Sequence, residues 1–407
     1  MLNLLTKTQT WLVVSLAAAT TLCAEPCKTK NCVIVPERGH EMAEEQVRPA
    51  YGAPALIDVR NSWDCYATGS FIYWQARQEN MEIGLISAND PEGKMSIGDL
   101  PFHTSYVNNM EVTSPNFTFR PGFKLGFGVR LNWDGWDAFT EYTRFHGKIS
   151  SGVRPLPPST ALTGSSHPNG EYLYPIQGSP GGNSGTTLLS PYFFQSANQA
   201  WKLKIDFLDL SLARAYYSGT KLTVRPFFGV RGAWLRQNLK TSYTGSTAYL
   251  DPQSDTSGFL DTRVSNFYTS WGLGPRTGFE SNWMLGRGFR FIGNGSGDVL
   301  YTRYSLHSGQ QTHLIVPTVS PIVTNVSVSQ KIDYLRTHLD LEMGFGWGSY
   351  FYHNDYHFDL SATYGFQVFW NQNMFRNFED AFAPATSFAP NGDLFIHGLT
   401  MNARFDF

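Results

Sequence analysis

The sequence predicts an all-β chain that closes into a transmembrane antiparallel up-and-down β-barrel of about ten to twelve strands. Three observations predict this fold class. The last strand alternates between apolar and polar residues up to the final residue, aromatic residues are frequent where charged residues are scarce, and no long apolar helix follows the N-terminus. Together they favour strands as the membrane-crossing elements, because the signal of a barrel is spread over many alternating segments.

The closing strand carries the strongest pattern. Residues 394–407 read L-F-I-H-G-L-T-M-N-A-R-F-D-F, so every second residue from Leu399 to Phe407 is apolar. Such alternation gives a strand one apolar face and one polar face, and it rarely extends to a free terminus, which usually frays. The edge strand of a soluble β-protein is the alternative. We expect the barrel assembly machinery to recognise a membrane-insertion signal made of Leu399, Met401, Ala403, Phe405 and Phe407.

The composition of the 407 residues supports the same class. Aromatic residues make up 15% and charged residues 16%, whereas soluble domains carry about 25% charged residues. Mean hydropathy is nevertheless negative, and no run after the N-terminus approaches the ~18 apolar residues of a spanning helix. The net charge of -2 gives no basic footprint, so nucleic acid is not an expected partner.

The N-terminal 24 residues are predicted to be a cleaved signal peptide. Lys7 supplies the positive charge, residues 11–22 the apolar stretch, and residues 22–24 a plausible cleavage site. Cys23 raises a lipoprotein alternative, which Leu22 disfavours because a small residue is expected there. Residues 25–61 are predicted to be a periplasmic or lumenal N-terminal segment, and residues 62–407 the outer-membrane barrel.

Three cysteines would remain after cleavage. Cys27 and Cys32 are close enough in sequence to close a small loop, which leaves Cys65 odd. An odd cysteine in an exported protein suggests a free thiol or an intermolecular bridge. The sequence therefore leaves the pairing open, and it predicts no metal site, because two cysteines alone hold zinc poorly.

Ten strands emerge from the alternation. The connections between them run alternately long and short, which is typical of a barrel with short periplasmic turns, long outer loops and both termini in the periplasm. Residues 78–116 are predicted to be a long polar loop, and an extra hairpin within it is the alternative that would make twelve strands. The predicted strands cover 64–77, 117–131, 138–147, 201–217, 222–236, 266–280, 289–304, 334–348, 358–370 and 394–407.

Two of these strands are irregular. In residues 201–217 the apolar face switches after Phe207, which indicates either a β-bulge or apolar side chains turned inward. In residues 289–304 the G-N-G-S-G stretch predicts an interruption at residues 293–297. Residues 237–265 and 305–331 are predicted to be loops.

Four stretches resemble one known family. They are W-D-A-F-T-E-Y-T-R-F (136–145), L-D-L-S-L-A-R-A-Y-Y (208–217), K-L-T-V-R-P-F-F-G-V-R-G-A-W (221–234) and G-F-Q-V-F-W-N-Q-N (365–373). They are similar to the pore-forming major outer membrane protein family of Legionella and chlamydia-like bacteria. The resemblance implies an outer-membrane β-barrel that passes solutes. The early cysteines are also similar to those of the disulfide-linked chlamydial envelope, which implies a role in stiffening the cell surface.

The inward positions of the predicted strands carry charges of both signs. In a pore such charges select ions, but in a narrow barrel they also pair with one another and fill space. The ten-to-twelve-strand range lies between filled and open barrels, and inward glycines either widen the lumen or permit tight coiling. The candidate pore-lining residues are Lys124, Arg130, Arg225, Arg231, Arg276, Glu280, Arg336, Asp340 and Glu342.

The function that these patterns favour is a porin for small hydrophilic solutes or ions, with no cofactor and no enzyme activity. A surface adhesin acting through residues 148–200, or a structural barrel with a plugged lumen, are alternatives. A lipase or protease near His353 and His357 is a weaker one, since G-x-S-x-G and H-E-x-x-H are absent. Expected partners are outer-membrane lipid and disulfide-linked or homo-oligomeric envelope proteins.

Overall fold

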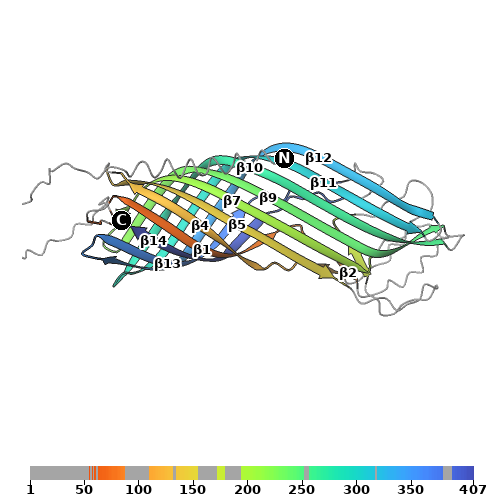
Figure 1. The fold of residues 1–407 in the computed structure, drawn as a ribbon, viewed down its shortest axis with the longest axis horizontal. Coiled ribbons are helices and arrows are strands. Elements are labelled where there is room, and N and C mark those ends of the chain that lie inside the picture. Colours follow the sequence, from red (N-terminus) through yellow and green to blue (C-terminus); the bar gives the residue numbers. More distant parts are fainter. Residues whose placement is uncertain are drawn as a thin grey trace, which may run out of the picture.

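The strands form a closed antiparallel barrel, which confirms the predicted fold class (Figure 1). The computed structural model describes residues 63–87, 110–131, 134–154, 172–178, 194–251, 256–316, 319–378 and 387–407, together with residues 55, 57, 59 and 60. Neighbouring strands follow the order β10-β11-β12-β13-β14-β1-β4-β5-β7-β9, and a β9–β10 ladder closes the ring. Ten long strands therefore build the wall, the lower limit of the predicted range.

The bounds of the strands are as follows. The wall consists of β1 (Cys65–Gln78), β4 (Phe119–Arg130), β5 (Trp136–Val153), β7 (Ser196–Arg214), β9 (Leu222–Asp251), β10 (Thr256–Gly286), β11 (Phe289–Val316), β12 (Val319–Phe351), β13 (Tyr356–Phe369) and β14 (Leu394–Asp406). Short β8 (Tyr216–Tyr217) pairs with β9. A separate small sheet consists of β2 (Gly84–Ser87), β3 (Met110–Thr113) and β6 (Tyr172–Pro175).

All connections at one end of the barrel, here called the turn end, are short. The other end, the loop end, carries the long β1–β4, β5–β7 and β13–β14 connections and the short β9–β10 and β11–β12 connections. At the turn end, β10 joins β11 through Arg287 and Gly288, whose φ angles are +54° and +82°. Two consecutive positive φ angles define the two-residue hairpin turn whose twist matches that of paired strands. The C-terminus lies at the turn end, where β14 finishes (Figure 1).

The predicted loops at residues 237–265 and 305–331 are wrong. β9 and β10 stay paired from Trp283↔Leu222 to Thr256↔Asp251, and β11 and β12 pair up to Val316↔Val319. These hairpins extend the wall well beyond the other strands at the loop end (Figure 1). Apolar alternation reports contact with lipid, whereas in these extensions the outer face is polar and buried inward residues such as Thr241, Thr262 and Gln310 are polar too, so the pattern is missing.

Residues 78–116 add no strand to the barrel. They contribute β2 and β3, and β2 pairs with β3 on one side and with β6 on the other. The twelve-strand alternative therefore does not hold for the described residues. The backbone groups of this stretch find their partners in a small sheet at the loop end rather than in the wall.

Neither predicted irregularity breaks its strand. The β5–β7 and β7–β9 registers run without a shift, so no β-bulge is present, and Trp201, Leu203, Ile205 and Phe207 are buried in the lumen. β11 also continues through residues 293–297. Phe279 lies 3.2 Å from the place where a side chain on Gly295 would begin, so a large side chain on β10 covers the glycine.

The outer face of the barrel carries an apolar belt. On the closing strand Leu399, Met401 and Phe405 are exposed, while Asp406 is fully buried and Thr400 nearly so, as the alternation predicts. On β10, Trp271 and Trp283 point outward and stand twelve residues apart. At about 3.3 Å per residue and a tilt of about 40° this spans roughly 30 Å, enough for the hydrocarbon layer between aromatic girdles.

The chain crosses the turn end before β1 begins. The Ala55 N–H donates to the Ala215 carbonyl at 3.1 Å, and the Arg60 N–H donates to the Asn354 carbonyl at 2.9 Å. These acceptors belong to the β7–β8 and β12–β13 connections, which lie on opposite sides of the ring. The described part of the predicted N-terminal segment therefore bridges the mouth of the barrel.

Cys65 takes part in a disulfide bond, so the free-thiol alternative does not hold. Its partner lies outside the described residues, as do Cys27, Cys32 and the predicted signal peptide. No helix in the described part of the chain is long and apolar enough to cross a membrane.

Candidate functional site in the barrel lumen

The lumen near mid-height holds a set of interlocking charges, here called the charge layer. Its side chains point inward from β4, β5, β7, β9, β10, β11 and β12, because alternate residues of each strand face the interior. Three members are cationic and five are carboxylates. The charge layer consists of Lys124, Glu141, Asp209, Arg231, Arg276, Asp298, His338, Asp340 and Glu342.

Arg231 is the centre of this layer. Its Nε and Nη2 donate to the two carboxylate oxygens of Asp209 at 2.6 and 2.7 Å, and its Nη1 donates to Asp298 Oδ2 at 2.8 Å. The guanidinium also lies 4.7 Å from the centre of the Phe207 ring. Arg231 is only 4% exposed. Two-pronged pairing with a carboxylate is the geometry that best satisfies a buried guanidinium.

Some pairs in the charge layer span the lumen. Lys124 on β4 lies 3.9 Å from Glu141 on neighbouring β5, but also 3.5 Å from Glu342 on β12. β12 is on the far side of the ring from β4. The opposing walls therefore meet through side chains at this height, and a solute would have to pass between these groups.

A second group of charges, the mouth cluster, lies at the turn end. Its signs balance, with four arginines and four carboxylates. Arg225 Nη1 lies 2.8 Å from Glu280, the Tyr66 hydroxyl donates to Asp137 at 2.7 Å, and Arg404 lies 3.8 Å from the Tyr66 ring centre. The charged members are Arg130, Asp137, Arg225, Glu280, Arg290, Asp359, Arg404 and Asp406.

Above the charge layer, toward the loop end, the lumen is filled by apolar side chains, here called the apolar layer. From the wall it takes Ile72, Trp74, Phe145, Trp201, Leu203, Ile205, Phe207, Leu235 and Leu239. Met81, Met374 and Phe375 reach it from connections rather than from wall strands. The apolar layer therefore combines residues of the wall with residues that enter from the loop end.

The inner segment, residues 372–378 of the β13–β14 connection, seals this layer. Phe375 is 1% exposed and lies 5.4 Å from the Tyr268 ring. The Tyr268 hydroxyl donates to the Gln372 carbonyl at 2.8 Å, and the Asn266 amide exchanges two hydrogen bonds of 3.0 Å with the Arg376 backbone. The inner segment is therefore tied to β10 by about three hydrogen bonds and one buried ring.

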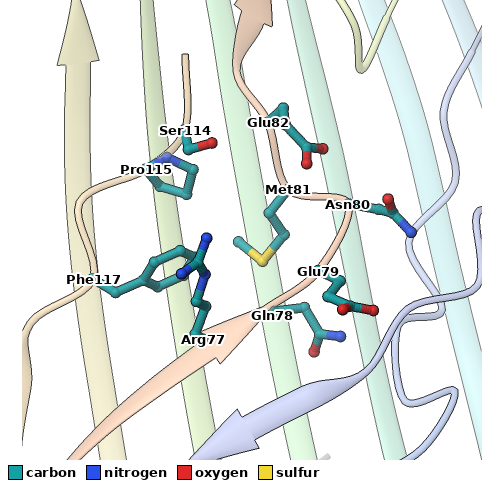
Figure 2. Close-up of a pocket in the computed structure, with 9 residues that line it drawn as sticks. All are labelled: Arg77, Gln78, Glu79, Asn80, Met81, Glu82, Ser114, Pro115 and Phe117. Carbon is teal, nitrogen blue, oxygen red and sulfur yellow. The ribbon is translucent and has the colours of Figure 1, made fainter. Parts of the chain in front are cut away.

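Two cavities flank the inner segment at the loop end. One of about 290 Å³ is lined by residues 77–82, 114, 115 and 117, and Figure 2 shows Arg77 lying alongside the Phe117 ring there. Another of about 200 Å³ lies between the inner faces of β11 and β12 and Met374, Arg376, Ala389 and Asn391. Met81 and Met374 of the apolar layer help line these cavities, whereas no residue of the charge layer lines either one. Neither cavity therefore continues through the charge layer.

All nine charged residues predicted to line a pore face the lumen. Lys124, Arg231, Arg276, Asp340 and Glu342 meet in the charge layer, and Arg130, Arg225 and Glu280 belong to the mouth cluster. Arg336 is apart from both, with its Nε donating to the Tyr304 hydroxyl at 3.1 Å in the apolar layer. Whether these residues line a conducting pore stays a prediction.

Sequence reasoning missed several members of the site. Asp209 and Asp298 fall where the alternation is weak, next to the phase switch of β7 and the glycines of β11. Tyr66 and Asp137 face the lumen at strand starts, where the pattern is short. The inner segment carries no periodic signal, and only its buried aromatic and amide residues set it apart from an ordinary loop.

The described residues offer no metal centre, since no group of three or more His, Cys, Asp or Glu side chains could hold an ion there. His353 lies in the exposed β12–β13 turn with a φ of +59°, whereas His357 on β13 is buried, with its Nδ1 3.1 Å from Asp406. The two histidines therefore do not share one face of a strand.

An inward charge network inside a lipid-facing belt of ten strands defines an outer-membrane β-barrel protein. The sequence profile of the Legionella pneumophila major outer membrane protein precursor matches residues 58–407, so the chain belongs to this family. The suspected resemblance is confirmed, and an outer-membrane location follows. No curated protein sequence matches the chain.

Two solved structures are remotely similar to the chain. The outer-membrane protease OmpT from Escherichia coli is 8% identical with a TM-score of 0.33, over 84% of this chain and 96% of that chain. A FadL homologue from Pseudomonas aeruginosa is 7% identical with a TM-score of 0.25, over 84% of this chain and 89% of that one. At these values neither structure bears on the activity of this chain.

Proposed function

We propose that this barrel lets small hydrophilic solutes and ions cross the outer membrane through a lumen that the inner segment closes. The observation that carries the proposal is the way the upper lumen is closed. Its seal includes a segment of a connection, residues 372–378, held to β10 by hydrogen bonds and one buried ring. A segment of this kind can leave without breaking any ladder of the wall.

The charge layer supports passage of hydrated solutes. Five of its polar atoms are buried without a hydrogen-bond partner among the described residues: Arg276 Nε, Asp298 Oδ1, His338 Nε2, Asp340 Oδ1 and Glu342 Oε1. Buried polar atoms require partners, and water supplies them in a polar cavity. The layer also has more carboxylates than cations, which favours cations as the permeating ions.

Planar-bilayer conductance tests the proposal. We expect the mature wild type to open briefly in discrete, salt-dependent steps, and Phe375→Ser to raise the open probability by at least about tenfold. A buried phenylalanine holds its position by roughly 3 kcal/mol. Phe388→Ser is the matched control, because Phe388 lies in the same connection but is 46% exposed. A folded, heat-modifiable barrel that stays silent in all three forms would overturn the pore.

Selectivity is tested on the same channels. Asp340→Asn with Glu342→Gln removes two carboxylates of the charge layer, and the reversal potential in a salt gradient should then move from cation preference toward none. Glu111→Gln, on β3 outside the barrel wall, should leave it unchanged. An unchanged potential in the double variant would show that the charge layer does not select.

A closed structural barrel is the second candidate. The apolar layer favours it, because wall residues such as Leu203 and Ile205 are fully buried and would be wetted by an open pore. A silent Phe375→Ser variant would decide for this candidate. For either function we propose no enzyme activity, since the two histidines considered for catalysis lie in different environments.

A further inference from the structure

Five basic side chains gather on the outer face of three neighbouring strands. They are Lys148 on β5, Lys202 and Lys204 on β7, and Arg236 and Lys240 on β9, and all five are exposed. Their sequence neighbours Ile149, Leu203, Leu235 and Leu239 are buried in the lumen, so alternation fixes these five outward. We call this set the basic patch.

The strand register brings like charges together in the basic patch. Lys148 is directly opposite Lys202, and Lys204 is directly opposite Arg236. Like charges at opposed positions of a sheet destabilise the pair. None of the five forms an ion pair with another described residue, so the repulsion is not relieved within the described part of the chain.

The nearest carboxylate on this face is already engaged. Asp206 accepts a hydrogen bond of 2.8 Å from the Tyr142 hydroxyl, and its other oxygen lies 3.4 Å from His146 Nε2. On β11, by contrast, Arg303 is paired with Asp333 at 2.8 Å. Other basic residues are exposed nearby, with Arg144 of β5 directly opposite Asp206 and Arg263 of β10 diagonal to Lys240. Directly opposed pairs of basic residues, however, occur in the described registers only across β5, β7 and β9.

The height of the patch fits the headgroup region of the membrane. Asp206 is opposite Trp234, and Trp234 is opposite Trp271 of the aromatic girdle. Lys204 and Arg236 lie two residues beyond this row toward the loop end. Below the row, Leu210, Val230 and Leu273 are exposed to the hydrocarbon. The apolar surface and the basic surface are therefore adjacent along the same strands.

We propose that the basic patch binds the phosphate groups of an anionic lipid of the outer leaflet, whose acyl chains lie along the apolar belt below. Charge complementarity carries the assignment: a phosphate between Lys204 and Arg236, or between Lys148 and Lys202, turns each repulsive pair into a bridged one. Long lysine and arginine stems can lie on apolar surface while their charged ends reach the headgroups.

The test uses the mature protein in detergent micelles and bisphosphorylated lipid A as the probe. Native mass spectrometry would follow binding to wild type and to K202Q/K204Q/R236Q. Each basic group near an anionic lipid surface contributes about fivefold, so we expect binding on the order of 100-fold weaker for the triple variant and about fivefold weaker for K204Q. The triple control R60Q/K221Q/R287Q removes exposed charges at the turn end and should bind like wild type.

Two further probes separate the sources of the signal. Lipid A stripped of its phosphates should bind wild type as weakly as the triple variant binds the intact lipid. Inorganic phosphate at the same concentration should give no binding. Equal binding of the stripped lipid, equal binding of free phosphate, or an unchanged affinity in a triple variant that remains heat-modifiable would each overturn the proposal.

Discussion

The charge layer and the apolar layer both fill the lumen, but they differ in what holds them closed. In the charge layer, ion pairs join wall strands to wall strands, as Arg231 joins β9 to β7 and β11. In the apolar layer, wall residues pack against the inner segment, which belongs to a connection. The charge layer thus consists of wall residues alone, whereas the apolar layer also contains residues of a connection that is not part of the wall.

This difference locates both the stability and the opening of the barrel. Removing a charge from the lower layer leaves its partners buried and unpaired, which destabilises the whole wall. Displacing the inner segment exposes apolar side chains of the upper layer but leaves every wall ladder intact. A barrel built in this way can open from the loop end while its mid-height network stays in place.

The largest expected effect is in the charge layer. Arg231→Ala leaves Asp298 buried without an arginine and Asp209 with Arg276 alone, 3.4 Å away, and breaking a buried pair in this way costs about 3–5 kcal/mol. Urea unfolding in lipid vesicles, followed by tryptophan fluorescence, measures the loss. The double variant Arg231→Ala with Asp209→Ala should lose less than the sum of its two single variants. A single-variant loss under about 1 kcal/mol would mean that the layer is solvated rather than paired.

The next effect sharpens the contrast with the apolar layer. Ile205 is fully buried there, and Ile205→Ala should cost about 2–5 kcal/mol through the cavity it leaves. Unlike the Arg231→Ala loss, this one should not change with ionic strength. The control is Leu210→Ala on the same strand, whose side chain is 50% exposed toward lipid and should cost much less. Equal losses at both positions would show that the lumen at Ile205 is not packed.

The membrane belt was predictable from sequence, and the wall beyond it was not. Lipid forces strict alternation on residues such as those of β14, so a range of ten to twelve strands and the facing of most of them followed from the pattern. Beyond the hydrocarbon, the inward residues of β9 to β12 are buried but many are polar, such as Thr241, Thr262 and Gln310, so these strand ends looked like loops. Hydrogen bonding between two adjacent strands sustains a hairpin there without leaving any hydrophobic period.

The candidate site was predictable only in part for a related reason. The alternation of residues along each strand predicted that Lys124 and Glu342 point inward. It did not predict that the Lys124 amine and the Glu342 carboxylate approach to 3.5 Å. That contact depends on the width of the closed ring, which no local pattern encodes. Likewise the switch of the apolar face after Phe207 predicted an irregularity in β7. That the inward residues before the switch form an apolar layer is seen only when the other strands of the ring are in place.

A smaller effect is expected at the loop end, beyond both layers. The Tyr243 hydroxyl donates to the Ile83 carbonyl at 2.5 Å and links β9 to the stretch leading into β2. Tyr243→Phe should cost about 1 kcal/mol at neutral pH, the typical value of one hydrogen bond. Urea unfolding of both proteins between pH 7 and pH 11 measures this difference.

The pH dependence of that difference has a definite sign. Burial raises the pKa of the Tyr243 phenol well above its ordinary value, which is about 10. The unfolded chain therefore loses this proton at a lower pH than the folded chain does. The advantage of wild type over Tyr243→Phe should be complete below pH 10 and shrink as the pH rises above it. A difference that grows above pH 10 would contradict the buried, neutral phenol.

The smallest effect is expected for a pair outside the lumen altogether. Arg303 makes two contacts with Asp333, at 2.8 and 2.9 Å, a geometry as good as that of Arg231 with Asp209. Arg303 is half exposed, however, and water and salt weaken such pairs. Arg303→Ala should therefore shift the urea midpoint far less than Arg231→Ala, and the shift should vanish in 1 M salt, where the screening length is about 3 Å. If the two variants lost equal stability, the geometry of the ion pairs rather than their burial would set the strength of the charge layer. The charge layer would then not owe its stability to its position inside the lumen.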